Sequence, residues 1–321
     1  MRVTFLSPEA AIVGLAVGVP IFALMLAESR ARIARAVLRL PAPLARGWPY
    51  VAAIAAFAAF VSIGAAQPVL ERERTRAVRN DAEAFFAFDT TRSMGASSSA
   101  TSDTRFERAV RLGKEMRAAL PELRVGVASV TDRVLAHLFP TANYQSFELT
   151  VDKAIGIERP ASVQRGNGLG SSLEAFAGVP KQEFFAPRTQ YRLLVIFTDA
   201  ESRPLNRAFL TNSFRGSRIE TIVIRLGSDR ERVYEDDGAP DPRYVPEEGA
   251  AEAADAFAEA TGGSVFEEDE LGQAIDAARR GAGEGGPQAE SKEIEPTPLA
   301  SYAFAAAFLP LAFLLWRRNF R

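Results

Sequence analysis

The stretch FFAFDTTRSM, residues 85–94, decides the fold of this chain together with LLVIFTD, residues 193–199. Each begins as a short run that is apolar on both faces and then reaches an acidic residue, Asp89 in one and Asp199 in the other. Such runs are typical of buried parallel strands, whose last residues emerge at the carboxyl edge of a sheet. We therefore expect the two carboxylates to meet at one edge of an α/β sheet.

Two hydroxyl side chains, Thr91 and Ser93, follow the first acidic residue at alternate positions. A single turn after the strand can therefore direct the carboxylate of Asp89 and two neutral oxygens towards one point. This is a ligand set for a hard divalent cation, with Mg²⁺ the first candidate and Mn²⁺ or Ca²⁺ the alternatives. The plainer interpretation is that Asp89 and Asp199 cap turns at the sheet edge while the hydroxyls bond to local backbone.

Composition excludes several classes of site. The chain has 321 residues, a formal net charge of -2 and no cysteine, so it has no global basic field for nucleic acid and no thiolate site. Its single histidine, His137, lies in an alternating run at residues 134–139, which indicates a strand residue on a half-exposed face. A Ser-His-Asp triad and a histidine-rich metal site are not expected.

Three uncharged apolar segments, at about residues 10–27, 50–66 and 299–316, are candidates for membrane spans. Each is close to the roughly 20 residues that cross a hydrocarbon layer about 30 Å thick. Because a central charge would cost roughly 2.5 to 3.5 kcal/mol on insertion scales, the absence of charge favours spans over core helices. Residues 1–70 are thus expected to form two transmembrane helices joined by an arginine-rich loop, with a third helix near the C-terminus.

Arginines set the expected orientation of these helices. The loop between the first two spans carries five arginines against one acidic residue, and three more arginines follow the last span: Arg30, Arg32, Arg35, Arg39, Arg46, Arg317, Arg318 and Arg321. The positive-inside rule places both segments in the cytoplasm, so everything between the second and third spans is expected outside. The helical spacing of apolar residues within 31–40 also allows an interfacial helix on anionic lipid, or a binding site for a partner.

The chain between the spans, residues 83–280, is predicted to form one α/β domain with a doubly wound, mostly parallel sheet. Apolar or alternating runs predict strands at 84–89, 123–130, 134–138, 191–199, 219–226 and 264–266. Helical patterns lie at 106–120, 169–176, 252–261 and 271–278. Only three residues separate the second and third strands, which indicates a hairpin and therefore one antiparallel strand. The Gly-, Glu- and Pro-rich residues 281–298 are expected to be a flexible tether.

A third loop is expected at the carboxyl edge of this sheet. Ligand sites in such sheets lie beyond the carboxyl ends of the strands, where strand order reverses. The glycine-rich stretch RGNGLGSS, residues 165–172, approaches a predicted helix and is the candidate for this loop. It has no Walker lysine, which disfavours nucleotide binding.

With these residues in view, the domain resembles a von Willebrand factor A (VWA) domain with a metal-ion-dependent adhesion site. The first motif of that family, Asp-x-Ser-x-Ser, stands here as Asp89-Thr90-Thr91-Arg92-Ser93, in which threonine keeps the middle oxygen. The threonine of the second loop corresponds to Asn167, which offers an amide oxygen in place of a hydroxyl. The third element matches Asp199, although the glycine that usually follows is Ala200 here.

The order of elements along the whole chain resembles the Bat (aerotolerance) type of bacterial membrane protein. The resemblance implies a multi-pass protein of the cell membrane whose domain binds a protein partner through the cation, without catalysis. It also implies a membrane complex with sibling VWA membrane proteins and a MoxR-type AAA ATPase.

Two alternatives from other classes stay open. A Mg²⁺-dependent phosphatase of the haloacid-dehalogenase type also begins with an aspartate after its first strand, but it needs a second aspartate where Thr91 stands. A membrane scaffold with a degenerate metal site would instead use the alanine-rich faces at 52–59 and 303–307 for close helix packing.

Overall fold

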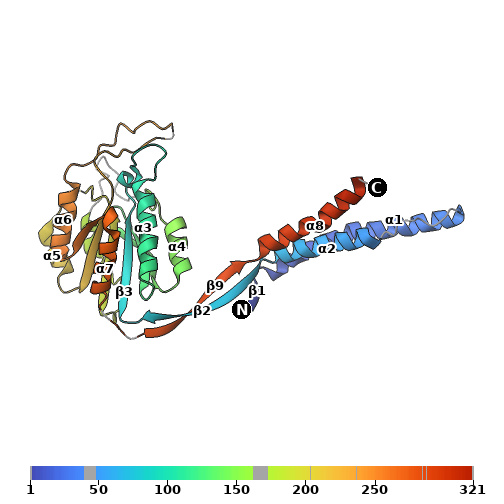
Figure 1. Ribbon diagram of the computed structural model, residues 1–321, viewed down its shortest axis with the longest axis horizontal. Helices are drawn as coiled ribbons and strands as arrows, with labels where there is room; N and C mark the ends of the chain where they lie inside the picture. The colour runs from blue at the N-terminus through green and yellow to red at the C-terminus, as the bar shows by residue number, and fades with distance from the viewer. Residues whose placement is uncertain are drawn as a thin grey trace. The chain divides into compact units, whose positions relative to one another are not determined.

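The computed structural model describes residues 2–39, 48–161, 173–202, 204–235, 237–283, 285–286 and 288–319 (Figure 1). These residues form two compact units. One comprises Met1–Arg74 with Ile294–Arg321, and the other comprises Thr75–Glu293. The glycine-rich stretch 165–172, with Asn167, lies outside the described residues.

The larger unit is built around a six-stranded sheet with the order β5-β4-β3-β6-β7-β8. Its strands are β3 (Ala82–Asp89), β4 (Arg124–Val130), β5 (Val134–Thr141), β6 (Tyr191–Thr198), β7 (Ile219–Arg225) and β8 (Ser264–Glu267). All neighbouring pairs are parallel except β4 and β5, which run antiparallel. The predicted doubly wound sheet with one antiparallel strand is therefore confirmed.

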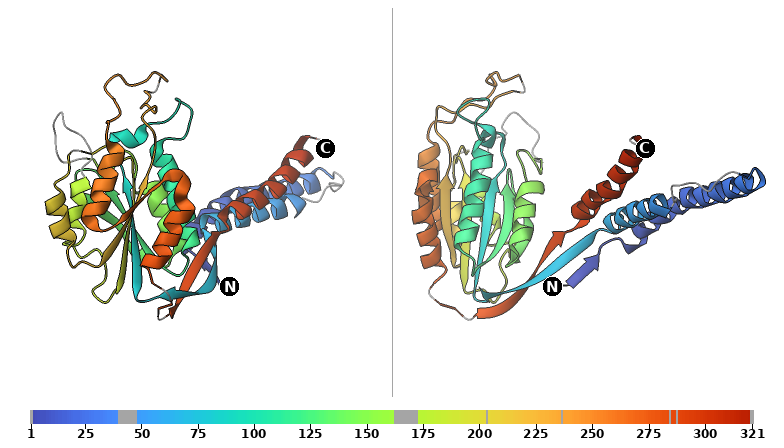
Figure 2. Two further views of the ribbon diagram at one scale, coloured as in Figure 1. Left: turned by 60° about the vertical axis from the view of Figure 1, so that its left-hand side comes forward. Right: turned by 45° about the vertical axis from the view of Figure 1, so that its right-hand side comes forward.

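Helices cover both faces of this sheet (Figure 2). One core lies beneath α3 (Arg105–Ala119), α4 (Tyr144–Lys153) and α7 (Leu271–Gly281). The other lies beneath the 3₁₀ helix η3 (Leu173–Gly178), α5 (Arg207–Phe214) and α6 (Ala250–Thr261). Because the unit has a hydrophobic core on each face, we expect residues 75–293 to fold as an isolated segment.

Strand β3 is the centre of the domain. All of its residues are buried, and alternate side chains enter opposite cores, with Phe86 and Phe88 in one and Phe85 and Ala87 in the other. The ring of Phe88 stacks on that of Phe197 in β6, with 4.8 Å between ring centroids. This packing fixes the ends of β3 and β6 relative to each other, and so positions the residues that follow them.

Most predicted elements of the domain are found, with three differences. Helices α4 and α5 are absent from the sequence prediction. The helix expected at 169–176 is described only from Leu173, where the chain forms the 3₁₀ helix η3. The apolar periodicity of α4 and α5 is short, at ten and eight residues, which makes their signal weak.

The smaller unit contains three helical segments that are long and apolar enough to cross a membrane: Pro8–Val37, Trp48–Ala65 and Ala300–Arg317. The first combines a 3₁₀ stretch, η1 (Pro8–Val17), with α1 (Gly18–Val37), so the helix continues into the arginine-rich segment predicted as a loop. The others are α2 (Trp48–Ala65) and α8 (Ala300–Asn319). These segments indicate a membrane location.

Helices α2 and α8 pack against each other. Ala53 and Ala58 of α2 and Ala307 of α8 are buried, and a Cβ on Gly64 would lie 2.8 Å from the ring of Phe304. The scaffold alternative uses small residues for packing against helices of a partner. At these positions the small residues instead make contacts between α2 and α8 of the same chain.

A second sheet corrects the prediction of a flexible tether at 281–298. Residues Gln288–Pro298 form strand β9, in a three-stranded sheet with β1 (Arg2–Phe5) and β2 (Pro68–Arg79) in the order β1-β2-β9. Strands β1 and β2 are antiparallel, and the Thr4 hydroxyl donates to Glu71 at 2.6 Å. Strands β2 and β9 are rich in charged residues, so no apolar pattern predicts them. Their pairing rests on backbone hydrogen bonds, which do not depend on apolar side chains.

Candidate metal site

The carboxyl ends of β3 and β6 meet at one edge of the six-stranded sheet. The register pairs Phe88 with Phe197, so Asp89 and Asp199 follow directly from neighbouring parallel strands. Both are buried, with exposures of 0% and 2%. The structure thus brings the two predicted acidic residues together.

The turn after β3 gathers oxygen atoms around Asp89. The Oδ1 atom of Asp89 accepts from the backbone N–H of Thr91 at 2.9 Å and from its hydroxyl at 2.6 Å. The Thr91 hydroxyl lies 3.1 Å from that of Ser93, at the start of a 3₁₀ turn, Arg92–Gly95. Ser93 is half-buried, so this row of oxygens leads from the interior towards the surface.

Burial makes the Asp89 carboxylate costly to ionise in the absence of a cation. Burial first, and then the charge of Asp199, raise the pKa of Asp89 to about 7. Hydrogen bonds from Thr198, whose hydroxyl donates to Oδ2 at 2.6 Å, and from Thr91 oppose the rise. A divalent cation at this point would offset the two adjacent negative charges.

The carboxylate of Asp199 is held by its own loop and by α3. Its Oδ1 atom accepts from the backbone N–H of Glu201 at 3.0 Å, and its Oδ2 atom accepts from Nη1 of Arg105 at 3.0 Å. Ala200, between the two acidic residues, has a φ of 59°, a left-handed conformation that glycine adopts without strain. The departure from glycine noted in the sequence is thus accommodated at some conformational cost.

Arg105 and its partners were missed in the sequence. This arginine is 2% exposed and contacts acidic and polar groups from the loops after β6 and β7, namely Asp199, Glu201, Ser228, Glu231 and Tyr244. Although burial opposes it, the charge of Asp199 and the bonds to Glu201 and Glu231 raise the pKa of Arg105. Burial, followed by Asp199, raises the pKa of Glu201.

One local signal points to this cluster. Thr104 caps α3 through a capping box with Glu107, which makes Arg105 the first residue of the helix. A cation is disfavoured at a helix N-terminus, so an arginine there suggests a compensating acidic partner elsewhere in the fold. The identity of that partner depends on tertiary contacts.

The donor set fits a hard divalent cation. Among the residues that the structure describes, no group of three or more histidine, cysteine, aspartate or glutamate side chains has the arrangement of a metal site. The candidate set differs in kind, because it combines two carboxylates with the hydroxyls of Thr91 and Ser93. Neutral oxygens of this type are ordinary ligands of Mg²⁺ and Ca²⁺.

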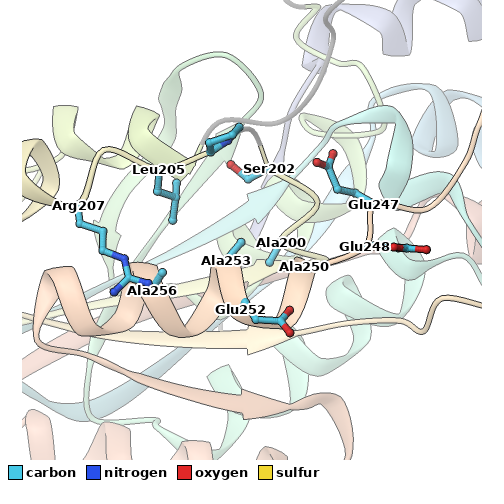
Figure 3. Close-up of a pocket in the computed structure, with 12 residues that line it drawn as sticks. Ala200, Ser202, Leu205, Arg207, Glu247, Glu248, Ala250, Glu252, Ala253 and Ala256 are labelled. Carbon is cyan, nitrogen blue, oxygen red and sulfur yellow. The ribbon is translucent and has the colours of Figure 1, made fainter.

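A pocket of about 310 Å³ lies beside the candidate site (Figure 3). Its lining includes Ala200 and Ser202, which follow Asp199, and Ala250 and Ala253 of α6. Glu247 and Glu248 contribute acidic side chains to its lining. A pocket lined in part by alanine therefore adjoins the loop that follows Asp199.

The comparisons with known proteins agree with this architecture. No family profile and no curated protein matches the sequence. Among solved structures, BatB of Bacteroides thetaiotaomicron aligns with a TM-score of 0.51 and 17% identity, over 63% of this chain and 98% of that one. An aerotolerance-related membrane protein of Bacteroides fragilis aligns with a TM-score of 0.50 and 19% identity, over 61% and 98%.

At these identities the likeness concerns the fold. The α/β domain described above shares its fold with these two proteins, as the resemblance to Bat-type proteins drawn from the sequence predicts.

Proposed function

We propose that this chain is a membrane-anchored adhesion module. Its α/β domain binds a protein partner through a divalent cation held by Asp89, Thr91, Ser93, Asn167 and Asp199, and the partner supplies a carboxylate to that cation. Mg²⁺ is the first candidate, and Mn²⁺ and Ca²⁺ are the alternatives. Asn167 enters from the sequence pattern alone.

The observation that supports this function best is the arrangement of oxygens around Asp89. A fully buried carboxylate lies beside a second one, and the Thr91 and Ser93 hydroxyls extend from it towards the surface at 2.6 and 3.1 Å spacings. A plain turn cap does not need a second buried carboxylate beside it, because burying like charges together is costly. A divalent cation between the two carboxylates would offset that cost.

The chemistry of such a site is binding without bond cleavage. When several ligands of a divalent cation are neutral hydroxyls or amides, the cation keeps part of its positive charge and accepts a further carboxylate. The residues of this chain would hold the cation and orient its open side. Ser93, the half-exposed member of the set, marks the side from which a partner would approach.

We further propose a multi-pass topology with the α/β domain outside the cytoplasm. The arginines of the segment between the first two spans and of the C-terminal tail support it through the positive-inside rule. A cytoplasmic MoxR-type ATPase would then reach only residues 28–48 and the tail, whereas sibling VWA membrane proteins could meet the metal site. These partners follow from the Bat resemblance.

A metal titration followed by partner capture tests the proposal. Millimolar Mg²⁺ or Mn²⁺ should slow amide exchange in β3 of the full chain in detergent micelles, because a ligand that binds only the native state stabilises it by mass action. Asp89→Ala should remain folded, lose this response and recover fewer partners in pull-downs. A wild-type chain that shows no response to either metal would favour the scaffold alternative.

A further inference from the structure

A buried guanidinium lies directly behind the candidate metal site. Arg105 donates from Nη1 to Asp199 at 3.0 Å and to Glu201 at 2.6 Å, and from Nε to Glu231 at 2.7 Å. Its Nη2 atom donates to the Ser228 carbonyl at 3.0 Å. One side chain thus holds the loop that carries Asp199, the loop after β7 and the start of α3.

The backbone around this side chain is shaped to admit it. Gly227 has a φ of +90°, and a Cβ at that position would clash with Nε of Arg105 and with the carboxylate of Glu231. The Tyr244 hydroxyl lies 3.1 Å from Nη1 and itself donates to Glu201 at 2.7 Å. The fold thus provides both the space and the hydrogen-bond acceptors for a buried guanidinium group.

We propose that Arg105 is an internal counter-cation whose charge beside Asp199 opposes binding of the divalent metal and so sets how tightly the domain holds that metal. The inference rests on the proposed function, because it concerns the same site. Both oxygens of Asp199 are paired within the protein, one with Arg105 and the other with the Glu201 N–H. These bonds within the protein fix the orientation of the Asp199 carboxylate.

The same positive charge weakens the hold on a metal. Like charges in a partly dry site repel strongly, so a unit charge beside Asp199 lowers the affinity for a divalent cation by about tenfold or more. It also leaves the bound cation less neutralised by the protein. A cation in that state attracts the carboxylate of a partner more strongly. The positive charge of Arg105 therefore both weakens metal binding and strengthens docking of the partner.

A purely structural role is the competing explanation, and Arg117 provides the matched control. It lies in the same helix, is 0% exposed, and donates to the carbonyls of Leu120 and Ala142. Arg105→Met and Arg117→Met both remove a buried guanidinium of α3 and keep an unbranched side chain. Arg105→Lys retains the positive charge but loses the planar fork of donors.

The test measures Mn²⁺ binding by titration calorimetry and β3 amide exchange, with the full chain in nanodiscs. Arg105→Met should stay folded in chelator with reduced exchange protection, bind Mn²⁺ about tenfold more tightly than the wild type, and regain protection when Mn²⁺ is added. Arg105→Lys should stay within about threefold of the wild-type dissociation constant. Arg117→Met should lose protection while its Mn²⁺ affinity stays unchanged.

Two results would overturn the inference. One is an Arg105→Met chain that folds and binds Mn²⁺ no more tightly than the wild type. The other is an Arg105→Met chain whose exchange protection stays reduced at saturating Mn²⁺, since a metal that replaces the missing charge should restore that protection. Failure of the proposed function looks different, because the wild-type chain would then give no binding heat with Mn²⁺.

Discussion

Replacement of Asp89 by asparagine should stabilise a cation-free domain much more at pH 8 than at pH 5. The native carboxyl has a pKa of about 7, against 3.8 for the ordinary group. Between these pH values the native state keeps a proton that the unfolded chain releases, so stability falls as pH rises through this window and levels off above about 7. The side-chain amide of the variant has no such proton to lose.

The magnitude follows from the same pKa values. Raising the pKa from 3.8 to about 7 corresponds to roughly 4 kcal/mol of cost for the ionised native state at pH 8. The amide removes that cost but disturbs the hydrogen bond from Thr198 to Oδ2, which is worth about 1 kcal/mol. We therefore expect Asp89→Asn to be more stable than the wild type by about 3 kcal/mol at pH 8. At pH 5, only about one pH unit above 3.8, the cost is roughly 1.5 kcal/mol, so the gain in stability should shrink to less than about 1 kcal/mol.

Urea unfolding of segment 75–293 in chelator, followed by far-UV circular dichroism at pH 5 and pH 8, measures this difference. Asp81→Asn is the matched control. Asp81 is buried, and the bond from Arg79 at 2.8 Å holds its pKa below the ordinary value. Stability from Asp81 is lost only as pH falls through that lowered pKa, so its asparagine variant should lose equal stability at pH 5 and pH 8. The same loss at both pH values for Asp89→Asn would refute the electrostatic reasoning.

Three further predictions concern the cap of α3, the core and the topology. Thr104→Ala should cost about 1 kcal/mol in urea unfolding by removing the capping box with Glu107, and a loss below a few tenths would contradict that role. Phe197→Ala should cost roughly 3 to 5 kcal/mol because its ring stacks on Phe88, and a loss under 1 kcal/mol would show that the core refills the space. Because the chain lacks cysteine, one cysteine placed at exposed Asp103 should react with an impermeant maleimide on intact cells, and reaction only after lysis would reverse the topology.

Much of the domain can be predicted from its sequence because its strands are buried on both faces. The residues of β3 are all apolar or small apart from Glu83 and Asp89, and the same holds for most of β6, so local composition alone identifies them as central strands. The short connection from β4 to β5 forces an antiparallel pair. The turn after Asp89 is also local, which is why the positions of Thr91 and Ser93 could be anticipated.

The features that escaped prediction depend on partners far away in the chain. Strand β2 carries alternating charges and becomes a strand only because β1 and β9 supply its neighbours. Arg105 is polar and begins a helix, a position that usually indicates solvent. It is buried because Asp199 and Glu231 arrive from two loops more than 90 residues further along the chain. No periodic pattern records such contacts.

The charges of the candidate site are balanced in two different ways when no cation is bound. Near neutral pH a proton on Asp89 removes one negative charge, whereas the guanidinium of Arg105 compensates the charge of Asp199. Only the proton has to leave when a divalent cation binds, because Arg105 is fixed by Glu201 and Glu231 as well. Binding of the proposed cation should therefore release up to one proton at pH 6 and almost none at pH 8.5. Calorimetric titrations in buffers of different ionisation enthalpy measure this number directly. Equal proton release at both pH values would show that the cation does not bind at the Asp89 carboxylate.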